Sequence, residues 1–194
     1  LKNFLSRAAS LKSCDLRSSK KLKGFGTEAF SSCVSLEQLH LPGSVNRLAY
    51  FARNCPKLKV IDLSRLTCLQ SISESFSCPC GEQAQNPTAD DVQVLFGSLP
   101  KLEAITFSFC VLNNLKKFDV SGCKELISIG DGFGSDCPSL DTVIFGDHPL
   151  LDTIETRVFA NCLSLASVQF GNLPSLSAVS GDLFTDGTSL RDVD

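Results

Sequence analysis

The chain has 194 residues, of which 43% are hydrophobic and 20% charged, and its formal net charge is -3. This length and composition predict a folded protein with a substantial core in one or two domains. No apolar run approaches the roughly 20 residues that a membrane-spanning helix needs, and the N-terminal apolar stretch is too short for a signal peptide.

Apolar residues recur with a period of about 25 residues along most of the chain. Each unit reads LxxLxL, a turn, an LxxI pair, a polar linker, Phe and Cys. The period indicates a solenoid, and the alternation predicts short parallel strands with one buried face. The LxxI pair predicts an extended or 3₁₀ piece on the opposite side, and the linker predicts one helical turn. The units begin at Leu11, Leu36, Leu58, Leu102, Leu115, Leu140 and Leu165.

The segment 81–98 interrupts the repeats. It is polar and turn-rich at first, and Thr88 can then cap a short helix that reaches Phe96. Leu99 takes the place of the repeat cysteine, and 102–107 reads as a strand. Because Leu115 follows after about half a period, we expect a truncated unit here. The irregularity is either functional or an evolutionary scar.

Ten cysteines would ordinarily suggest disulfides or zinc. Cys33, Cys55, Cys80, Cys137 and Cys162 share one position of the repeat, so we expect them to stack in the core as small buried groups. Cys78-Pro-Cys80 lacks a second pair or a nearby His, which makes it a weak metal signal. Unpaired cysteines and the absence of a glycosylation acceptor favour an intracellular protein, with a secreted or cell-surface protein as the alternative.

Two phrases of the chain resemble one family. Phe30-Ser-Ser-Cys33-Val-Ser-Leu36-Glu-Gln-Leu39-His-Leu41-Pro42 and Phe159-Ala-Asn-Cys162-Leu-Ser-Leu165-Ala-Ser-Val168 look like the FxxCxSLxxLxLP phrase of leucine-rich repeats of the BspA-like type. The resemblance covers almost the whole chain except about 81–98. It implies an α/β-type solenoid, a right-handed superhelix with a parallel concave sheet and short helical or 3₁₀ turns, which binds other macromolecules.

We therefore expect a single domain over 1–194, with repeats at about 11–80 and 99–194 and an insertion at 81–98. The chain has no Met and ends at Leu190-Arg-Asp-Val-Asp194, the opening of another repeat. These features predict a fragment of a longer chain.

Candidate catalytic residues are few. His40 lies between two strand leucines and so points outward, and His148 belongs to a Gly146-Asp-His-Pro149 turn. Gly130-Asp-Gly132-Phe-Gly134 has no strand-to-helix context for a phosphate site. Asp90 and Asp91 are better explained as first-turn helix residues than as metal ligands. We predict no enzyme activity, no cofactor and no metal.

Residues between the strand leucines should face outward and form a partner-binding row. These are Glu37, Gln38, His40, Lys59, Asp62, Glu103, Thr106, Lys116, Lys117, Asp119, Asp141, Thr142 and Gln169. Their charges are mixed and no aromatic anchor is among them, so an ordinary solvated sheet face is the alternative.

Charge is uneven along the chain. Residues 1–70 hold 12 Lys and Arg against 4 Asp and Glu, whereas 71–194 hold 6 against 17. A basic patch of Arg17, Lys20, Lys21 and Lys23 could attract an acidic partner or nucleic acid, or could simply be a solvated edge.

Three functions follow, in order of preference. The first is a non-catalytic scaffold that binds a protein partner on the concave sheet face. The second is a docking subunit of a ribonucleoprotein or other large assembly that uses the basic N-terminal third. The third is a secreted or cell-surface adhesin.

Overall fold

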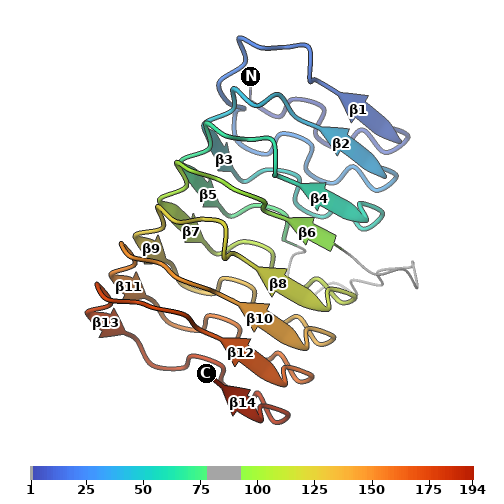
Figure 1. Ribbon diagram of the computed structural model, residues 1–194. Helices are drawn as coiled ribbons and strands as arrows, with labels where there is room; N and C mark the ends of the chain where they lie inside the picture. Colours follow the sequence, from blue (N-terminus) through green and yellow to red (C-terminus); the bar gives the residue numbers. More distant parts are fainter. Residues whose placement is uncertain (1, 78–92) are drawn as a thin grey trace.

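The computed structural model describes residues 2–77 and 93–194. In these residues the chain forms a parallel β-solenoid of about seven turns. Its strands are two or three residues long and lie in two parallel rows along the length of the molecule (Figure 1). None of the described residues is in a helix, so no helix in that part of the chain could cross a membrane.

One row of strands, here called the front side, comes from the LxxLxL phrases. It contains β1 (Ser13–Asp15), β2 (Gln38–His40), β4 (Val60–Asp62), β6 (Gln93–Leu95), β8 (Lys117–Asp119), β10 (Thr142–Ile144), β12 (Ser167–Gln169) and β14 (Asp192–Val193). From β2 to β12 the middle residue of each strand is buried and its neighbours are more exposed, because successive side chains point to opposite faces.

The second row, here called the back side, comes from the LxxI pairs. It contains β3 (Arg47–Ala49), β5 (Ser71–Ser73), β7 (Ala104–Thr106), β9 (Ser128–Ile129), β11 (Thr153–Ile154) and β13 (Ala178–Val179). These six strands form one continuous parallel ladder. The extended alternative for the LxxI pairs is therefore correct, and the 3₁₀ alternative is wrong.

The third side of each turn is built from left-handed backbone, not from the predicted helical turn. Glu28, Phe30 and Ser32 have φ values of 62°, 57° and 58°, and other turns repeat this alternation. Phe30 N–H donates to Phe4 O one turn back at 2.9 Å, whereas Ser32 N–H donates to Arg53 O one turn ahead at 2.8 Å. Each such non-glycine residue costs about 1 kcal/mol or more. Bonds to both neighbouring turns offset that cost, and a helical turn could not make them.

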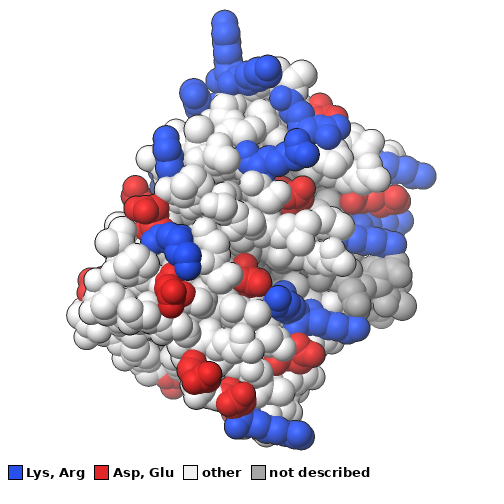
Figure 2. Space-filling view, viewed as in Figure 1, with Lys and Arg blue, Asp and Glu red and all other residues white. Residues whose placement is uncertain are grey.

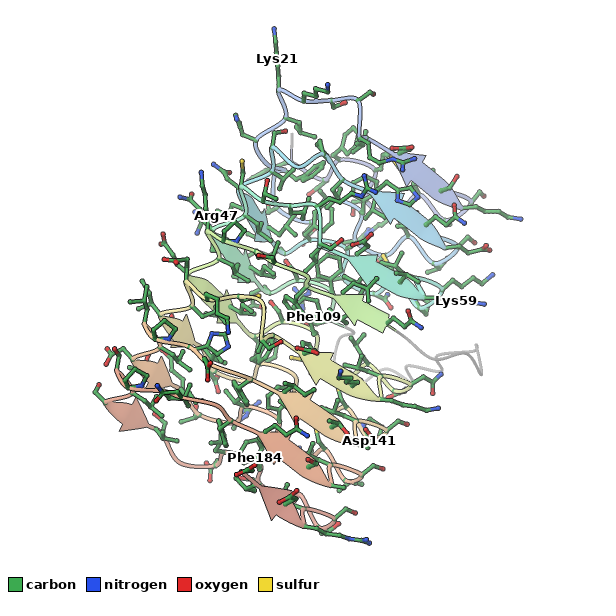
Figure 3. The ribbon with its side chains drawn as sticks, viewed as in Figure 1. Lys21, Arg47, Lys59, Phe109, Asp141 and Phe184 are labelled. Atoms are coloured by element: carbon green, nitrogen blue, oxygen red, sulfur yellow. The ribbon has the colours of Figure 1, made fainter. Side chains whose placement is uncertain are left out.

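The core contains stacked leucines and a column of phenylalanines. The Phe118 ring centroid lies 5.0 Å from that of Phe133 and 5.7 Å from that of Phe159, both near edge-to-face. Figure 3 shows Phe109 inside the column. Phe4 and Phe184, in the first and last turns, are only partly buried because they have a neighbouring turn on one side alone.

The repeat cysteines are buried at Cys33, Cys137 and Cys162, which confirms the prediction of a core position, while Cys55 is partly buried. Each thiol also approaches a main-chain carbonyl one turn earlier. Cys137 Sγ lies 3.3 Å from Phe109 O, and Cys162 Sγ lies 3.3 Å from Gly134 O. Cysteine therefore supplies a small apolar group and a weak hydrogen-bond donor at once.

The predicted truncated unit is wrong. The segment 102–107 contributes β7, which pairs with β5 and β9 on the back side. The front strand of that unit is β6, so the predicted helix is wrong where it reaches 93–96. Ile129 on the back side precedes Val143 on the front by 14 residues, but Ile72 precedes Val94 by 22. The irregularity is thus about eight extra residues between Ile72 and Val94. Thr88, the Asp90/Asp91 pair and the Cys78-Pro-Cys80 motif lie outside the described residues.

Candidate binding surface

Most of the predicted partner-binding residues do lie together on the front side. Glu37, Gln38, Lys59, Lys116, Lys117, Asp141 and Gln169 are exposed there, and His40, Asp62, Asp119 and Thr142 are partly exposed. Figure 3 shows Lys59 and Asp141 on the same edge of this side. Glu103 and Thr106 do not belong to the row, because β7 lies on the back side.

Two carboxylates of the front side are held by the turns that follow their strands. Asp62 Oδ1 accepts hydrogen bonds from Ser64 N–H at 3.0 Å and from its hydroxyl at 2.6 Å. Asp119 Oδ1 accepts the equivalent pair from Ser121, at 3.2 and 2.6 Å. These D-x-S turns fix the two carboxylates at the end of each strand.

Asp119 also forms an ion pair with its neighbour on the same strand, since Lys117 Nζ lies 3.1 Å from Asp119 Oδ2. Partial burial acts to raise the pKa of Asp119, but the hydrogen bonds from Ser121 and Lys117 outweigh it and the pKa is lowered. Both side chains of the ion pair remain substantially exposed, so it is available to exchange with other charged groups.

The front side is divided into three ladders, β1–β2, β4–β6 and β8–β10–β12–β14. In four turns the residue after a front strand donates to the last residue of the next strand, at 2.8 to 2.9 Å, and Phe170 N–H donates to Asp194 O, just after β14, at 2.6 Å. Val120 N–H to Ile144 O is one example. The equivalent bonds from Leu41 to Asp62 and from Phe96 to Asp119 are not made. The described strands therefore have a seam at β2/β4 and another at β6/β8.

A cavity of about 630 Å³ lies at the β6/β8 seam. It is lined by Ser64, Gln93, Val94, Leu95, Phe96, Gly97, Lys116, Lys117, Asp119, Ser121 and Gly122. The β2/β4 seam is nearly closed, with about 10 Å³. Just beyond the strands, the β6 and β8 turns touch, because a Cβ on Gly122 would lie 2.0 Å from Gly97 O. The seam is thus a wedge that closes at the turns.

The sequence reasoning missed Gln93 and Leu95, which are exposed on the front side. Leu95 is 43% exposed, and Val60 on the adjacent strand is 42% exposed, so an apolar spot borders the cavity. The signal was present: Gln93, Val94, Leu95 and Phe96 alternate between exposed and buried positions as a strand does. The helix assigned to this segment concealed it.

The predicted basic patch is not a set of four uncompensated charges. Arg17 donates to both carboxylate oxygens of Asp15, with Nη2 to Oδ2 at 2.6 Å. Hydrogen bonds from Arg17 lower the pKa of Asp15 to about 2. Lys20, Lys21 and Lys23 are exposed, and Lys21 projects from the first turn (Figure 3). Figure 2 shows basic side chains at this end and again on the edge near β4 and β8.

Comparison with known proteins assigns the family. The family described as BspA type Leucine rich repeat region matches residues 2–88 and 96–194 with six copies. The chain belongs to this BspA-type leucine-rich repeat family. No curated protein matches it. A leucine-rich repeat protein from Bacteroides ovatus, known from a crystal structure, is 16% identical with a TM-score of 0.32. The match covers 98% of this chain and 65% of that protein, so the chain spans less than two thirds of it.

The BspA-type repeat is a non-enzymatic scaffold fold. In the described part of this member, no three His, Cys, Asp or Glu side chains are grouped as metal ligands would be. His40 is partly exposed on the front side. His148 is fully buried, so it cannot reach a substrate in solution. What the described residues bring together on the front side is a row of exposed charged and polar side chains beside the cavity at the β6/β8 seam.

Proposed function

We propose that this BspA-type solenoid is a non-catalytic scaffold that binds a protein partner on its front side. The observation that carries the proposal is the combination, on one side, of exposed charged side chains with the 630 Å³ cavity at the β6/β8 seam. Stacked repeats hold these side chains at fixed spacing, which is how solenoids offer extended binding surfaces.

The contrast with the back side supports this choice. The back ladder is continuous over six strands, so its main-chain groups are satisfied within the sheet. The front side has an open seam, an apolar spot at Val60 and Leu95, and an exposed ion pair between Lys117 and Asp119. Partner contacts usually combine an apolar centre with a charged rim.

The alternative function is a docking subunit that touches nucleic acid or an acidic protein through Lys20, Lys21 and Lys23. The pairing of Arg17 with Asp15 reduces the charge of that patch. Binding by the patch would fall steeply with salt, because each neutralised phosphate releases counterions. The adhesin alternative predicts oxidised cysteines, whereas Cys14, Cys33, Cys68, Cys110, Cys123, Cys137 and Cys162 are free thiols.

The test compares charge-matched variants of the two sides. A partner is captured from the native source, identified, and titrated against the purified chain. Lys59→Glu on the front is paired with Arg47→Glu on the back, and Asp141→Lys on the front is paired with Glu103→Lys on the back. All four residues are exposed. We expect the front variants to weaken binding about tenfold and the back variants to change it less than about twofold.

Equal effects from the two sides, or losses confined to the back variants, would contradict the proposal. If partner binding is lost only when Lys20, Lys21 and Lys23 are neutralised, and if its affinity falls steeply with salt, the docking subunit is favoured instead.

A further inference from the structure

We infer that the third side carries a binding site for a phosphate or sulfate group between Arg7 and Arg53. The site is a cavity of about 160 Å³ lined by Ser6, Arg7, Glu28, Ser31, Ser32, Arg53 and Asn54. It is separate from the front side, and the inference does not rest on the proposed function. The cavity is smaller than the roughly 300–1,000 Å³ of sites for drug-sized ligands, so it suits a group of only a few heavy atoms.

Two guanidinium groups line this cavity, and the chain does not neutralise them. In the described residues, neither Arg7 nor Arg53 forms an ion pair with a carboxylate. Glu28 is the single acidic residue of the lining, so positive charge exceeds negative charge there. The surrounding chain has the same bias, since residues 1–54 contain nine Lys and Arg against three Asp and Glu. The electrostatic field at the cavity therefore attracts anions.

Arg53 is positioned so that its donor groups remain available. Its guanidinium carbon lies 5.9 Å from the centroid of the Tyr50 ring. A cation–π contact of this kind holds the guanidinium over the ring without using its N–H groups. These N–H groups form a fork that matches two oxygens of a phosphate or sulfate group. We therefore assign one of the two main contacts to Arg53 and the other to Arg7.

The polar groups around the two arginines also favour an anion. Arg7 N–H donates to Ser31 O at 2.7 Å, and Ser32 N–H donates to Arg53 O at 2.8 Å. These hydrogen bonds occupy carbonyl oxygens that would otherwise repel an anion. Asn54 Nδ2 donates to Ser32 Oγ at 3.5 Å. The hydroxyl hydrogen of Ser32 and the second amide hydrogen of Asn54 are then left to donate to the ligand.

The probes are inorganic phosphate, sulfate, O-phosphoserine and glucose 6-phosphate, each titrated into the ¹⁵N-labelled full chain at constant ionic strength. We expect phosphate to bind with a dissociation constant of about 1–10 mM. The amides of Ser32 and Asn54 and the Nε–H groups of Arg7 and Arg53 should shift most in a ¹H–¹⁵N spectrum. If O-phosphoserine binds most tightly, the group comes from a phosphorylated protein, and if glucose 6-phosphate does, it comes from a sugar phosphate. Equal affinities indicate the free ion.

Variants of the chain locate the site. Arg7→Gln and Arg53→Gln should each weaken phosphate binding at least about fivefold, because each removes a charged donor. The matched control Arg157→Gln should change binding less than about twofold, since Arg157 is exposed on the third side of a later turn.

Glu28 opposes an anion at this cavity, so its removal has the opposite effect. Glu28→Gln should tighten phosphate binding about two- to threefold, whereas Glu125→Gln, an exposed control outside the lining, should not. Loss of folding could weaken binding but could not tighten it.

Four results would overturn the inference. The first is the absence of any shift at about 20 mM phosphate, and the second is equal weakening by Arg53→Gln and Arg157→Gln. The third is unchanged or weaker binding in Glu28→Gln. The fourth is an oligouridylate that shifts the same amides at lower concentration than every phosphate monoester, because that result describes a nucleic-acid surface. None of these results changes the expected partner binding on the front side.

Discussion

The ring of His148 occupies the position that Cys123 fills one turn earlier, since Val143 pairs with Phe118 and each of the two residues lies five places further on. Both are fully buried, but neither ring nitrogen of His148 has a hydrogen-bond partner. Leu99 and Leu173 hold the equivalent place in other turns. A leucine therefore fits a position where the histidine leaves two polar atoms unsatisfied.

His148→Leu is expected to stabilise the chain, because an unsatisfied buried polar group costs about 1–3 kcal/mol. Burial lowers the pKa of His148, and Lys124 adds to this. The main-chain groups of Phe145 and Cys123, which lie near the ring but outside hydrogen-bond geometry, and the charge of Asp147 oppose it only in part. The unfolded state then binds more protons, so wild-type stability is lost as pH falls through and below the unfolded value of about 6.5. The difference between the urea unfolding midpoints at pH 8 and pH 5.5 should be smaller in His148→Leu than in the surface control His40→Gln. An unchanged pH dependence would contradict this account.

How far the sequence predicts the fold is visible at particular residues. The period and the leucine positions correctly identify the buried strand centres, such as Val143 and Val168. Burial of alternate side chains requires apolar residues at every second position of a strand, and this pattern is visible in the sequence. The same pattern does not show whether a strand belongs to the front side or to the back side. Leu102, Ile105 and Phe107 satisfy the front-strand pattern and yet form part of the back side.

The third side and the seam could not be predicted for a different reason. Left-handed residues such as Phe30 and Ser32 are unfavourable locally and are stabilised by bonds to other turns. The β6/β8 seam depends on a bond that Phe96 does not make. Neither feature has a local sequence signal, and both shape the candidate site.

Gly134→Ala should destabilise the chain by about 2 kcal/mol or more. Gly134 has φ of 66°, and an added Cβ would lie 2.4 Å from the Phe159 ring. Gly181→Ala is the matched control, because its Cβ would meet nothing within 4 Å. Thermal or urea unfolding of both variants measures the difference. Similar stabilities for the two variants would show that the third side tolerates a side chain at Gly134.

Cys162→Ala should cost about 1–3 kcal/mol, since it removes a buried group and leaves the Gly134 carbonyl without its thiol. The neighbouring Leu163 is 52% exposed, so Leu163→Ala should change stability by less than about 0.5 kcal/mol. Urea midpoints compare them. A smaller loss for Cys162→Ala than for Leu163→Ala would refute the core role of the repeat cysteine.

Thiol reactivity should differ sharply between the folded and unfolded chain. Burial raises the pKa of Cys110 to about 11 and that of Cys123 to about 12, so neither is a thiolate at pH 8. We expect slow reaction with a thiol reagent in the native state. In denaturant without reductant, all ten cysteines should react. Markedly fewer reactive thiols would indicate disulfides and favour the adhesin.

The central claim, that the front side binds the partner, is tested most directly by titrating the captured partner against Lys59→Glu and Arg47→Glu. The two variants make the same charge change on opposite sides of the same solenoid (Figure 3). The account predicts about tenfold weaker binding for Lys59→Glu and wild-type affinity for Arg47→Glu. Wild-type affinity for Lys59→Glu together with weakened binding for Arg47→Glu would contradict it.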